Sequence, residues 1–559
     1  MMITKLLLLA ILFVLVSAVL CLAQGFDRPT KTRSTRSLVS GRRGMVCTSQ
    51  VLAAEAGVAV LRRGGNAFDA SIAAAAVLNV VEPMSTGIGG DAFVLAWSAK
   101  EKKLVGLNGS GRSAATATIE RYRSEKGFDH FPTFGADSVT VPGAFHAWVT
   151  LHEKYGKLPF AELLTDAIHY ADAGFAVTEV IASAWQHGLR HQGVPEFAAN
   201  YLMREGNGFR APRLGEVFRQ PELAATFRAL ARGGVDEFYR GETARKISAY
   251  LESKGSLIRL EDLQRHDSEW VAPISVTYKG YELFELPPNG QGIVALEMLN
   301  VLEGYDVGAL DHNSAEYIHY LVEAKKLAFA DRDTYVTDPN VRKLPISELI
   351  SKEYAAKMRA RIDPERAKSF PRSTLDVGSD TVYLCTADEE GNLVSFINSI
   401  YYGFGSGLVV PETGICLQNR GALFSLEPEH LNRIEPSKRP LHTIIPAMVM
   451  KDGKPWFCFG VMGGDMQPQG HVQVLLNMIE FGMNPQEAGE AARVRETGGS
   501  VAVESGVKLS VRRELEKKGH TFTDAPGGFG GYQGILVDWD AGVYFGASDN
   551  RKDGCALGW

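Results

Sequence analysis

One stretch of this chain places a threonine where two interpretations are open. The stretch is DVGSDTVYLCTADEEGNLVSFINS, from Asp376 to Ser399, and its two hydrophobic runs joined by an acidic turn at Gly391 predict a β-hairpin. Thr381 opens the first strand. Because a threonine hydroxyl is a weak nucleophile unless a base lies beside it, Thr381 is either an ordinary β-branched strand residue or a reactive group that has still to be uncovered.

The other reactive residues do not favour metal or thiol chemistry. The 13 histidines are scattered and form no HExxH motif, so neither a catalytic metal nor a cofactor is expected. The six cysteines contain no CxxC pair, and five remain once Cys21 in the N-terminal apolar run is set aside. We interpret Cys385 and Cys458 as small buried hydrophobic residues, in a protein held by its core rather than by disulfides.

The composition sets broad limits on partners. The chain has 559 residues, of which 45% are hydrophobic and 22% are charged, so it is long enough to bury a large core. Its net charge of -6, from 59 basic and 65 acidic residues, does not favour nucleic acid or anionic lipid as a partner.

The N-terminus predicts export. One lysine precedes an apolar run from Leu6 to Leu22, which is typical of a secretory signal with cleavage after Ala23. The alternative is an uncleaved membrane anchor, because the run is close to the lower length limit for a spanning helix. Residues 24–43 are basic and rich in Ser and Thr, and we expect a flexible leader there. No later segment is long and apolar enough to span a membrane, so a secreted or periplasmic protein is expected.

The rest of the chain supplies the elements that must position Thr381. Residues 49–83 predict two helices separated by a Gly-Gly pair, and glycines then lead into a strand. Residues 145–360 are mainly helical in pattern, with a long amphipathic stretch over Phe160–Ala173. Between residues 381 and 450 strand follows strand, and the helical sequence HVQVLLNMIEFG comes later. Sheets covered by helices, an α+β layered architecture, are therefore expected.

Six motifs occur in order along the chain and carry a resemblance to a known family. They are GMVCTSQVLAAEAGVAVLRRGGNAFDASIAAAAVLNVVEPMSTGIGGDAF, ELPPNGQG, EAKKLAFADRDTYVTDP, KRPLHTIIPAMV, GVMGGDMQPQ and GASDNRKDG. Together they resemble the γ-glutamyltransferase family over nearly all of residues 44–559. The resemblance implies an N-terminal-nucleophile (Ntn) hydrolase fold, a four-layer αββα sandwich in which two stacked, mainly antiparallel sheets lie between helical layers.

The resemblance also implies a precursor that cuts itself. The cut would fall between Asp380 and Thr381 and give a large chain of residues 44–380 and a small catalytic chain of residues 381–559 within one domain. Thr381 would then carry a free α-amine, whose ordinary pKa of about 7.7–8 suits a base, so nucleophile and base would be on one residue. Because the amine must be neutral to act, activity is expected to rise from acid toward weakly alkaline pH.

The resemblance assigns roles to five further residues. Ser399 matches a hydroxyl that hydrogen-bonds the nucleophile, and its alternative is an ordinary strand serine. Gly463 and Gly464 match the pair whose N–H groups form an oxyanion hole, a task that suits glycine; the alternative is a plain turn between strand and helix. His442 and Thr443 match two consecutive hydroxyl residues that bind the substrate carboxylate, so the first position is changed to histidine.

The departures from the family pattern gather in the predicted substrate site. The position of the family's carboxylate-binding arginine falls on Gly109, and Arg112 is either its substitute or a surface arginine. Tyr401 stands where the family has asparagine. Leu423 stands where an aspartate holds the substrate amine, and Arg420 adds positive charge nearby, which suits an acid-bearing acyl group better than glutamate.

The sequence leaves three functions open. The first is an exported, self-processing amide hydrolase or acyltransferase that cleaves γ-glutamyl-type, glutathione-like amides and passes the acyl group to water or an amine. The second is an acylase or small-amide hydrolase with non-glutamyl donors, for which the short segment 424–440 predicts a more open pocket. The third is an uncleaved, inactive binding or scaffold protein. Whether the two-chain unit assembles into a homo-oligomer of heterodimers stays open.

Overall fold

The computed structural model describes residues 34–369, 380–523 and 528–559. The predicted signal peptide (1–23) and the leader as far as residue 33 lie outside the described residues, as does the side chain of Asp380 at the predicted cut. Within the described ranges, no helix combines the length and the apolar character needed to cross a membrane.

Two seven-stranded antiparallel sheets form the centre of the molecule. The first, which we call the hairpin sheet, has the strand order β23 (Cys555–Gly558), β2 (Gly44–Thr48), β12 (Asp380–Asp388), β13 (Leu393–Tyr401), β3 (Asp91–Ser98), β4 (Lys103–Gly109) and β9 (Glu269–Val271). The second, the partner sheet, has the order β1 (Val39–Gly41), β22 (Val543–Ser548), β21 (Tyr532–Asp538), β17 (Lys454–Val461), β16 (Ala447–Lys451), β11 (Tyr281–Glu285) and β10 (Ile274–Tyr278). The predicted hairpin is therefore β12–β13, at the centre of the first sheet.

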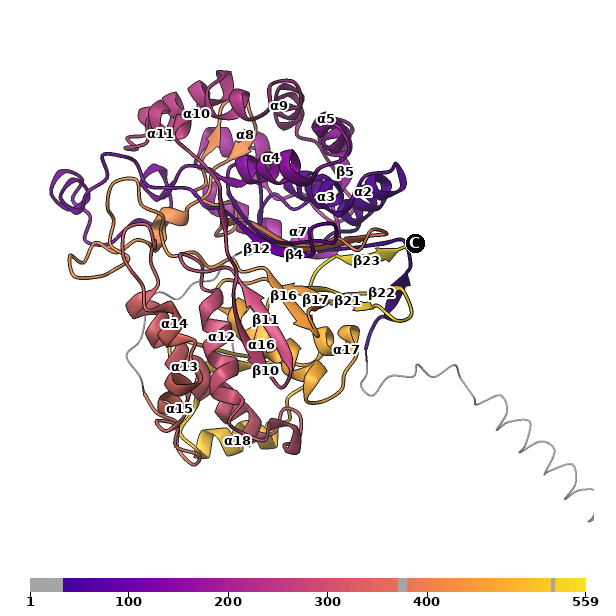
Figure 1. Cartoon of the computed structure of the whole chain (residues 1–559). Coiled ribbons are helices and arrows are strands. Elements are labelled where there is room, and N and C mark those ends of the chain that lie inside the picture. Colours follow the sequence, from indigo (N-terminus) through magenta and orange to yellow (C-terminus); the bar gives the residue numbers. More distant parts are fainter. Residues whose placement is uncertain (1–33, 370–379, 524–527) are drawn as a thin grey trace, which may run out of the picture.

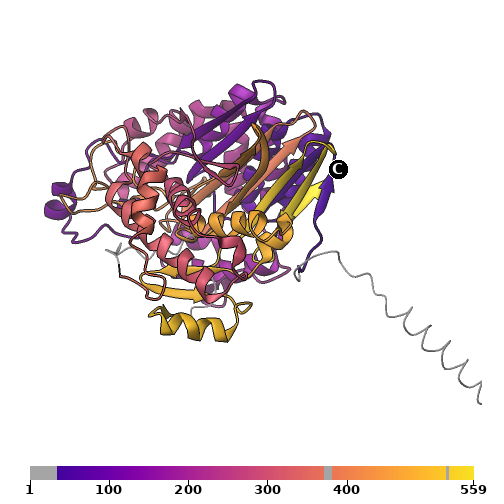
Figure 2. The ribbon, with the colours of Figure 1, turned by 60° about the horizontal axis from the view of Figure 1, so that its bottom comes forward.

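Helices cover the outer face of each sheet (Figure 1). On the side of the hairpin sheet lie α2 (Val51–Arg62), α3 (Ala67–Val81), α4 (Ala144–Tyr155), α5 (Phe160–Leu163), α6 (Thr165–Ala173), α7 (Glu179–Trp185), α8 (Pro195–Tyr201), α9 (Pro221–Tyr239), α10 (Glu242–Ser253) and α11 (Leu260–Gln264). On the side of the partner sheet lie α12 (Gly292–Leu302), α13 (Ala315–Tyr335), α14 (Ile346–Leu349), α15 (Lys352–Arg359), α16 (Met466–Ile479), α17 (Pro485–Glu490) and α18 (Leu509–Lys517), which Figure 2 brings to the front. The predicted four-layer αββα sandwich is confirmed.

Short strand pairs complete the connections. They are β5 (Phe175–Ala176) with β8 (Val217–Phe218), β6 (Met203–Glu205) with β7 (Gly208–Arg210), β14 (Val409–Val410) with β15 (Ile415–Cys416), and β18 (Val494–Thr497) with β19 (Ser500–Val503) and β20 (Thr521–Phe522). The sequence GICLQN contributes only the two residues of β15, because Gln418 and Asn419 beyond it direct their side chains to other segments. The stretch predicted as one amphipathic element over Phe160–Ala173 is divided between α5 and α6.

Three hydrophobic cores follow from the four layers. Alternate residues of a strand point to opposite faces of its sheet, so along β12 Leu384 packs toward the helices while Tyr383 and Cys385 pack between the two sheets. The inter-sheet core also contains Cys47 and Cys458. All five cysteines in the described part of the chain are free thiols, which agrees with the interpretation of Cys385 and Cys458 as small buried hydrophobic residues.

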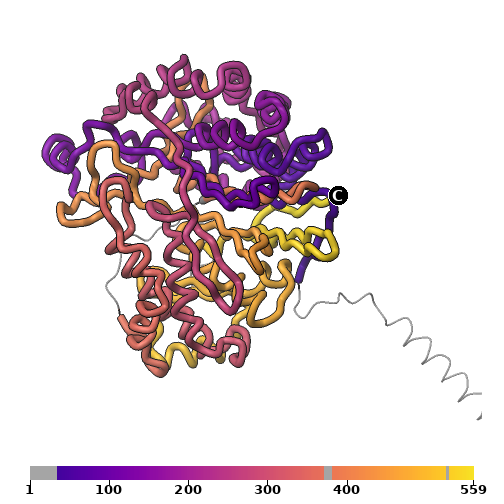
Figure 3. Tube along the Cα trace, in the orientation of Figure 1, coloured from indigo at the N-terminus to yellow at the C-terminus, as the bar shows by residue number. Residues whose placement is uncertain are grey.

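Segments from the two predicted chains alternate within each sheet. Strand β12 pairs with β2, β13 pairs with β3, and β2 pairs in turn with the C-terminal strand β23. The early and late parts of the chain therefore run side by side at the edge of the sandwich (Figure 3). A cut before Thr381 would leave every one of these ladders intact.

The fold predicts acid sensitivity at pH values where carboxyl groups are still ionised. Burial lowers the pKa of His442 to about 4 and that of His471 to about 3, so both rings stay neutral in the folded protein. The unfolded chain takes up these two protons below about pH 6.5. A fall in pH therefore stabilises the unfolded state relative to the folded state and lowers the free energy of unfolding. The midpoint of thermal unfolding should therefore fall steadily from about pH 6.5 toward about pH 4.5, measured by circular dichroism. A flat profile over this range would contradict the neutral buried histidines.

Candidate functional site

The hairpin brings the hydroxyls of Thr381 and Ser399 together. Thr381 Oγ1 donates a hydrogen bond of 3.1 Å to Ser399 Oγ, and the two residues are 1% and 0% exposed. Asp380 pairs with Tyr401 and Val382 with Asn398, so the register of the hairpin shifts at Thr381. Such an irregularity re-aims a side chain. The structure thus joins the predicted nucleophile to its predicted hydroxyl partner at the start of β12.

Arg420 lies at the centre of the predicted substrate residues. Its Nη2 donates to Ser399 Oγ (3.0 Å) and its Nη1 to Thr443 Oγ1 (2.7 Å). The guanidinium also lies over the Tyr401 ring, 4.3 Å from the ring centroid. Arg420 is fully buried, its Nε has no hydrogen-bond partner, and no carboxylate in the described parts of the chain forms an ion pair with it. A buried cation without a direct ion pair is costly, so the surroundings of Arg420 suit an anion.

Burial also weakens the charge of this guanidinium, although not enough to remove it near neutral pH. It lowers the pKa of Arg420 to about 10, while the carboxylate of Asp91 acts in the opposite direction. The aromatic face of Tyr401 supports the cation from one side. Tyr401 itself has a φ of 82°, a conformation that bulky residues rarely adopt, and its N–H donates to Ser399 Oγ (2.9 Å). Tyr401, which stands where the family pattern has asparagine, thus packs against Arg420.

A second buried charge, the carboxylate of Asp91, ties the loops of the site together. Asp91 is the first residue of β3 and pairs with Ser399 across the sheet. Its two oxygens accept hydrogen bonds from Gly111 N (3.0 Å), Gly143 N (3.2 Å), Gln418 Nε2 (3.0 Å) and His442 Nε2 (3.0 Å). Four donors on four segments satisfy the charge of this buried carboxylate.

His442 is occupied by contacts within the protein. Its Nε2–H donates to Asp91, its Nδ1 accepts from Ile444 N at 3.4 Å, and burial keeps the ring neutral by lowering its pKa to about 4. The ring also contacts Phe93, with 4.8 Å between the centroids. The geometry therefore makes His442 a residue that positions Thr443, and a direct contact between His442 and a substrate stays a prediction.

The glycine pair follows β17 and precedes helix α16. Gly463 and Gly464 have φ values of 107° and 57°, which favour glycine over any other residue. Because they stand just before the N-terminus of α16, the helix dipole favours negative charge there. The predicted oxyanion hole thus has the backbone conformation and the electrostatic setting that it needs, and its role stays a prediction.

Gln291 connects the glycine pair with the segment of Thr443. Its Nε2 donates to Gly464 O (3.0 Å) and to Thr443 O (2.8 Å). Its Oε1 accepts from Arg332 Nη1 (2.8 Å), which also bonds Asp465 (2.6 Å). One buried amide therefore sets the spacing between two segments of the site.

Arg112 stands apart from this arrangement. Its guanidinium bonds Glu269 (2.6 Å) and Asp338 (3.2 Å), and Glu269 is shared with the buried Arg439 (2.8 Å). Two carboxylates already neutralise Arg112, so Arg420 is the better anchor for a substrate carboxylate. A contact between Arg112 and a substrate stays a prediction, as does the more open pocket expected from segment 424–440.

Sequence reasoning missed Asp91 and Gln291. Asp91 ends the run GIGGD and Gln291 lies in PPNGQG, two motifs that signal turns. A signal was present in both: an acidic residue opens a strand that is otherwise apolar, and a polar residue opens the apolar helix α12. Buried polar groups at such positions must have hydrogen-bond partners.

The chain is similar to known proteins over most of its length. The family model described as "Gamma-glutamyltranspeptidase" matches residues 53–559. The chain is 39% identical over 531 residues to a Bacillus subtilis protein named "Glutathione hydrolase-like YwrD proenzyme", covering 93% of this chain and 99% of that protein. It is 36% identical over 538 residues to the "Oxamate amidohydrolase proenzyme" of Klebsiella pneumoniae, with coverages of 92% and 98%. Among solved structures, the cephalosporin acylase from Bacillus halodurans is similar, with a TM-score of 0.87, 44% identity and coverages of 96% and 99%.

Loss of the Ser399 hydroxyl should slow the chemistry of Thr381. In Ser399→Ala, Thr381 Oγ1 loses its acceptor, so we expect both the cut before Thr381 and amide hydrolysis to slow by at least about tenfold. Gel densitometry over time and release of p-nitroaniline from anilide substrates measure the two rates. Ser395→Ala is the matched control, because Ser395 lies on the same strand and bonds Tyr383 instead (2.7 Å). Equal rates in the two variants would contradict the role of Ser399.

Proposed function

The chain belongs to the gamma-glutamyltranspeptidase family, and from this premise we propose that it is a self-processing amide hydrolase. Thr381 is its N-terminal nucleophile, and Arg420 binds a carboxylate on the acyl group. The observation that carries the proposal is the buried Arg420 guanidinium, which contacts Ser399 and Thr443 and has no carboxylate partner among the residues described. A donor of the glutaryl type supplies that partner.

Processing begins at the bond between Asp380 and Thr381. Thr381 Oγ attacks the carbonyl carbon of Asp380, the carbon–nitrogen bond breaks, and the nitrogen takes up the hydroxyl proton. Water then cleaves the resulting ester, which leaves a carboxylate on Asp380 and a free amine on Thr381. The register shift at Thr381 and its bond to Ser399 support this step. The names of the similar proteins from Bacillus subtilis and Klebsiella pneumoniae also describe proenzymes.

Substrate hydrolysis uses the same residue. The neutral amine of Thr381 takes the proton from its own hydroxyl, and Oγ attacks the amide carbonyl of the donor. The oxyanion that forms is held by the N–H groups of Gly463 and Gly464 in front of helix α16. The proton passes to the leaving amine, and water or an amine acceptor then removes the acyl group from Oγ. The base acts within one residue, so a separate histidine is not required.

The shape of the site favours a donor without an α-amine. Leu423 replaces the aspartate that holds the substrate amine in the family, and it belongs with Tyr401 to one buried apolar cluster. An ammonium group placed against Leu423 and near Arg420 would lose its counter-ion and face a like charge. The acylase and oxamate names among the similar proteins support the same class of donor.

Two other functions remain as outcomes of the tests. Hydrolysis of γ-glutamyl amides as the main activity is favoured by the glutathione hydrolases among the similar proteins. An uncleaved, inactive scaffold is disfavoured, because the bonds among Thr381, Ser399 and Arg420 are retained. Secretion or export to the periplasm, and assembly of the two-chain unit into oligomers, belong to the proposal as expectations.

Intact-protein mass spectrometry tests the processing. The purified chain should convert into two chains, and the smaller should begin at Thr381. The Thr381→Ala variant should stay uncut and should not hydrolyse any anilide. A wild-type chain that stays whole after prolonged incubation would contradict the proposal and favour a scaffold.

Three anilides of matched length test the role of Arg420. Glutaryl-p-nitroanilide carries a terminal carboxylate, valeryl-p-nitroanilide lacks it, and γ-glutamyl-p-nitroanilide adds an α-amine. We expect kcat/KM to be highest for the glutaryl compound. In Arg420→Met, the preference for glutaryl over valeryl should fall by roughly tenfold to a hundredfold, which corresponds to about 1.5–3 kcal/mol for a charged hydrogen bond.

The control for this series is Arg112→Met, the same substitution in the other candidate arginine. It should leave the ratio of glutaryl to valeryl hydrolysis unchanged, because Arg112 is neutralised by Glu269 and Asp338. A ratio that falls in Arg112→Met and not in Arg420→Met would reverse the assignment. A γ-glutamyl compound that exceeds the glutaryl compound would establish the glutamyl function instead.

A further inference from the structure

Three potential metal ligands meet on helix α13, far from Thr381. His319 and Glu323 are one helical turn apart and so lie on the same face of the helix, and His520 faces them from the segment after α18. Their ligand atoms all lie within 4.8 Å of one another, and all three residues are buried. His319 is 13 residues before Arg332, which corresponds to about 20 Å along the helix. The cluster is therefore separate from the site around Gly464.

The hydrogen bonds of His319 prepare it to bind a metal. Its Nε2 lies 2.7 Å from the carbonyl oxygen of Asp363 and must carry the hydrogen, so its Nδ1 presents a lone pair to the cluster. A backbone carbonyl behind the ring is the usual support of a metal-binding histidine. Nδ1 of His319 lies 2.8 Å from Nε2 of His520.

Glu323 supplies the negative charge. Its Oε1 accepts from Lys326 Nζ (2.7 Å) and its Oε2 from Lys368 N (3.1 Å). Each carboxylate oxygen keeps a second lone pair, so both bonds persist while one oxygen binds a cation. The charge of Lys326, which pairs with Glu323, lowers the affinity of the site for a cation.

We propose that His319, Glu323 and His520 bind one divalent transition-metal ion, and that zinc is the preferred ion. Two imidazole nitrogens and one carboxylate oxygen are a known zinc ligand set, which leaves a fourth position for water. Two nitrogens bonded to one tetrahedral zinc at about 2.0–2.1 Å lie about 3.3 Å apart. On binding, the proton that His520 Nε2 donates to His319 Nδ1 moves to His520 Nδ1, so that both facing nitrogens present lone pairs. The two nitrogens separate by about half an ångström, which small side-chain rotations supply.

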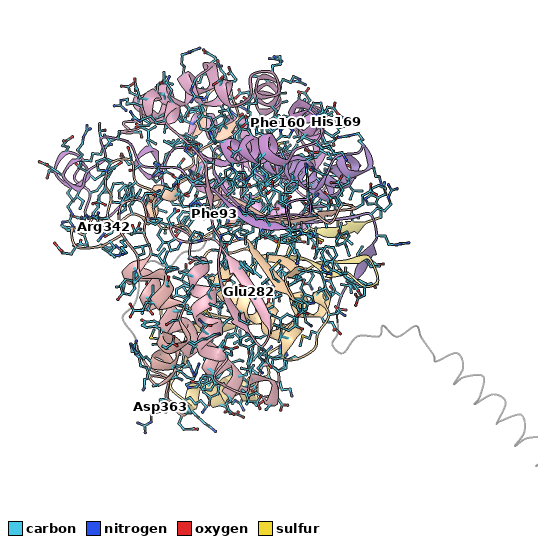
Figure 4. All side chains as sticks on the ribbon, in the orientation of Figure 1. Phe93, Phe160, His169, Glu282, Arg342 and Asp363 are labelled. Atoms are coloured by element: carbon cyan, nitrogen blue, oxygen red, sulfur yellow. The ribbon has the colours of Figure 1, made fainter. Side chains whose placement is uncertain are left out.

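The site would connect three parts of the molecule. His319 and Glu323 belong to the predicted large chain and His520 to the small chain, so the metal would bridge the two chains after the cut. His319 and Glu323 also bind the last described segment of the large chain, residues 363–369. His319 donates to Asp363 O, and Glu323 accepts from Lys368 N. Asp363 lies at the outer end of the lower helical layer, away from Phe93 between the sheets (Figure 4). The bridging role rests on the proposed cleavage, whereas metal binding does not.

Zinc titration of the chelator-treated full-length chain tests the site. Calorimetry should give one zinc per chain, and zinc should raise the thermal unfolding midpoint. In Glu323→Gln and His520→Gln the affinity for zinc should fall by at least about tenfold. His312→Gln is the control: His312 lies before α13 and outside the cluster, so this variant should bind zinc as the wild type does. Cobalt substitution should give the visible absorption of a tetrahedral N/O site in the wild type and in His312→Gln, but not in Glu323→Gln or His520→Gln. If zinc does not stabilise the wild type, His319 and His520 form only a hydrogen bond with each other, and the proposal is wrong.

The bridging role has its own readout. Zinc should raise the urea concentration at which the two processed chains separate, and His520→Gln should remove this effect. The uncut Thr381→Ala variant should still bind one zinc, so failure of processing and failure of the metal site are distinguishable. Zinc bound by the wild type with an unchanged separation midpoint would overturn the bridge.

Discussion

The need to satisfy a buried positive charge organises the candidate site. Arg420 is fully buried, and the groups that surround it are hydroxyls and an aromatic face rather than a carboxylate. Ser399 and Thr443 must therefore lie where they accept from its two terminal nitrogens, and Tyr401 must adopt a strained backbone conformation beneath it. Because Ser399 also accepts from Thr381, one hydroxyl joins the proposed anion-binding group to the proposed nucleophile. Under this proposal, substrate binding and the reacting atom are held in a single hydrogen-bonded unit.

The layered fold explains how such a unit withstands a break in the chain. In the hairpin sheet, strands β12 and β13 of the small chain lie between β2 and β3 of the large chain. In the partner sheet, β11 of the large chain pairs with β16 of the small chain. Every ladder at the interface between the chains is antiparallel and lies between buried cores. The proposed cut would free the amine of Thr381 without releasing the strand that carries it.

Much of the fold was predictable from the sequence, and the site only in part. The hairpin, the layered α+β class and the pairing of Thr381 with Ser399 followed from local patterns and from a resemblance that spans the chain. The partners of buried charges did not, because they come from distant segments: Asp91 and His442 are 351 residues apart, and Arg112 and Asp338 are 226 apart. Local sequence therefore left both Arg112 and Arg420 as candidate anchors. Only the folded chain distinguishes Arg112, which pairs with two carboxylates, from Arg420, which forms an ion pair with none of the described residues.

The central claim, that Thr381 carries the acyl group and Arg420 selects it, is tested most directly by trapping the intermediate. The processed enzyme would be mixed with glutaryl-p-nitroanilide, quenched in acid within the first turnover, and its peptides analysed by mass spectrometry. The account predicts a glutaryl ester on the first residue of the small chain, Thr381, at a much lower level in Arg420→Met. A glutaryl group on any other residue, or full turnover with no adduct on Thr381, would contradict it.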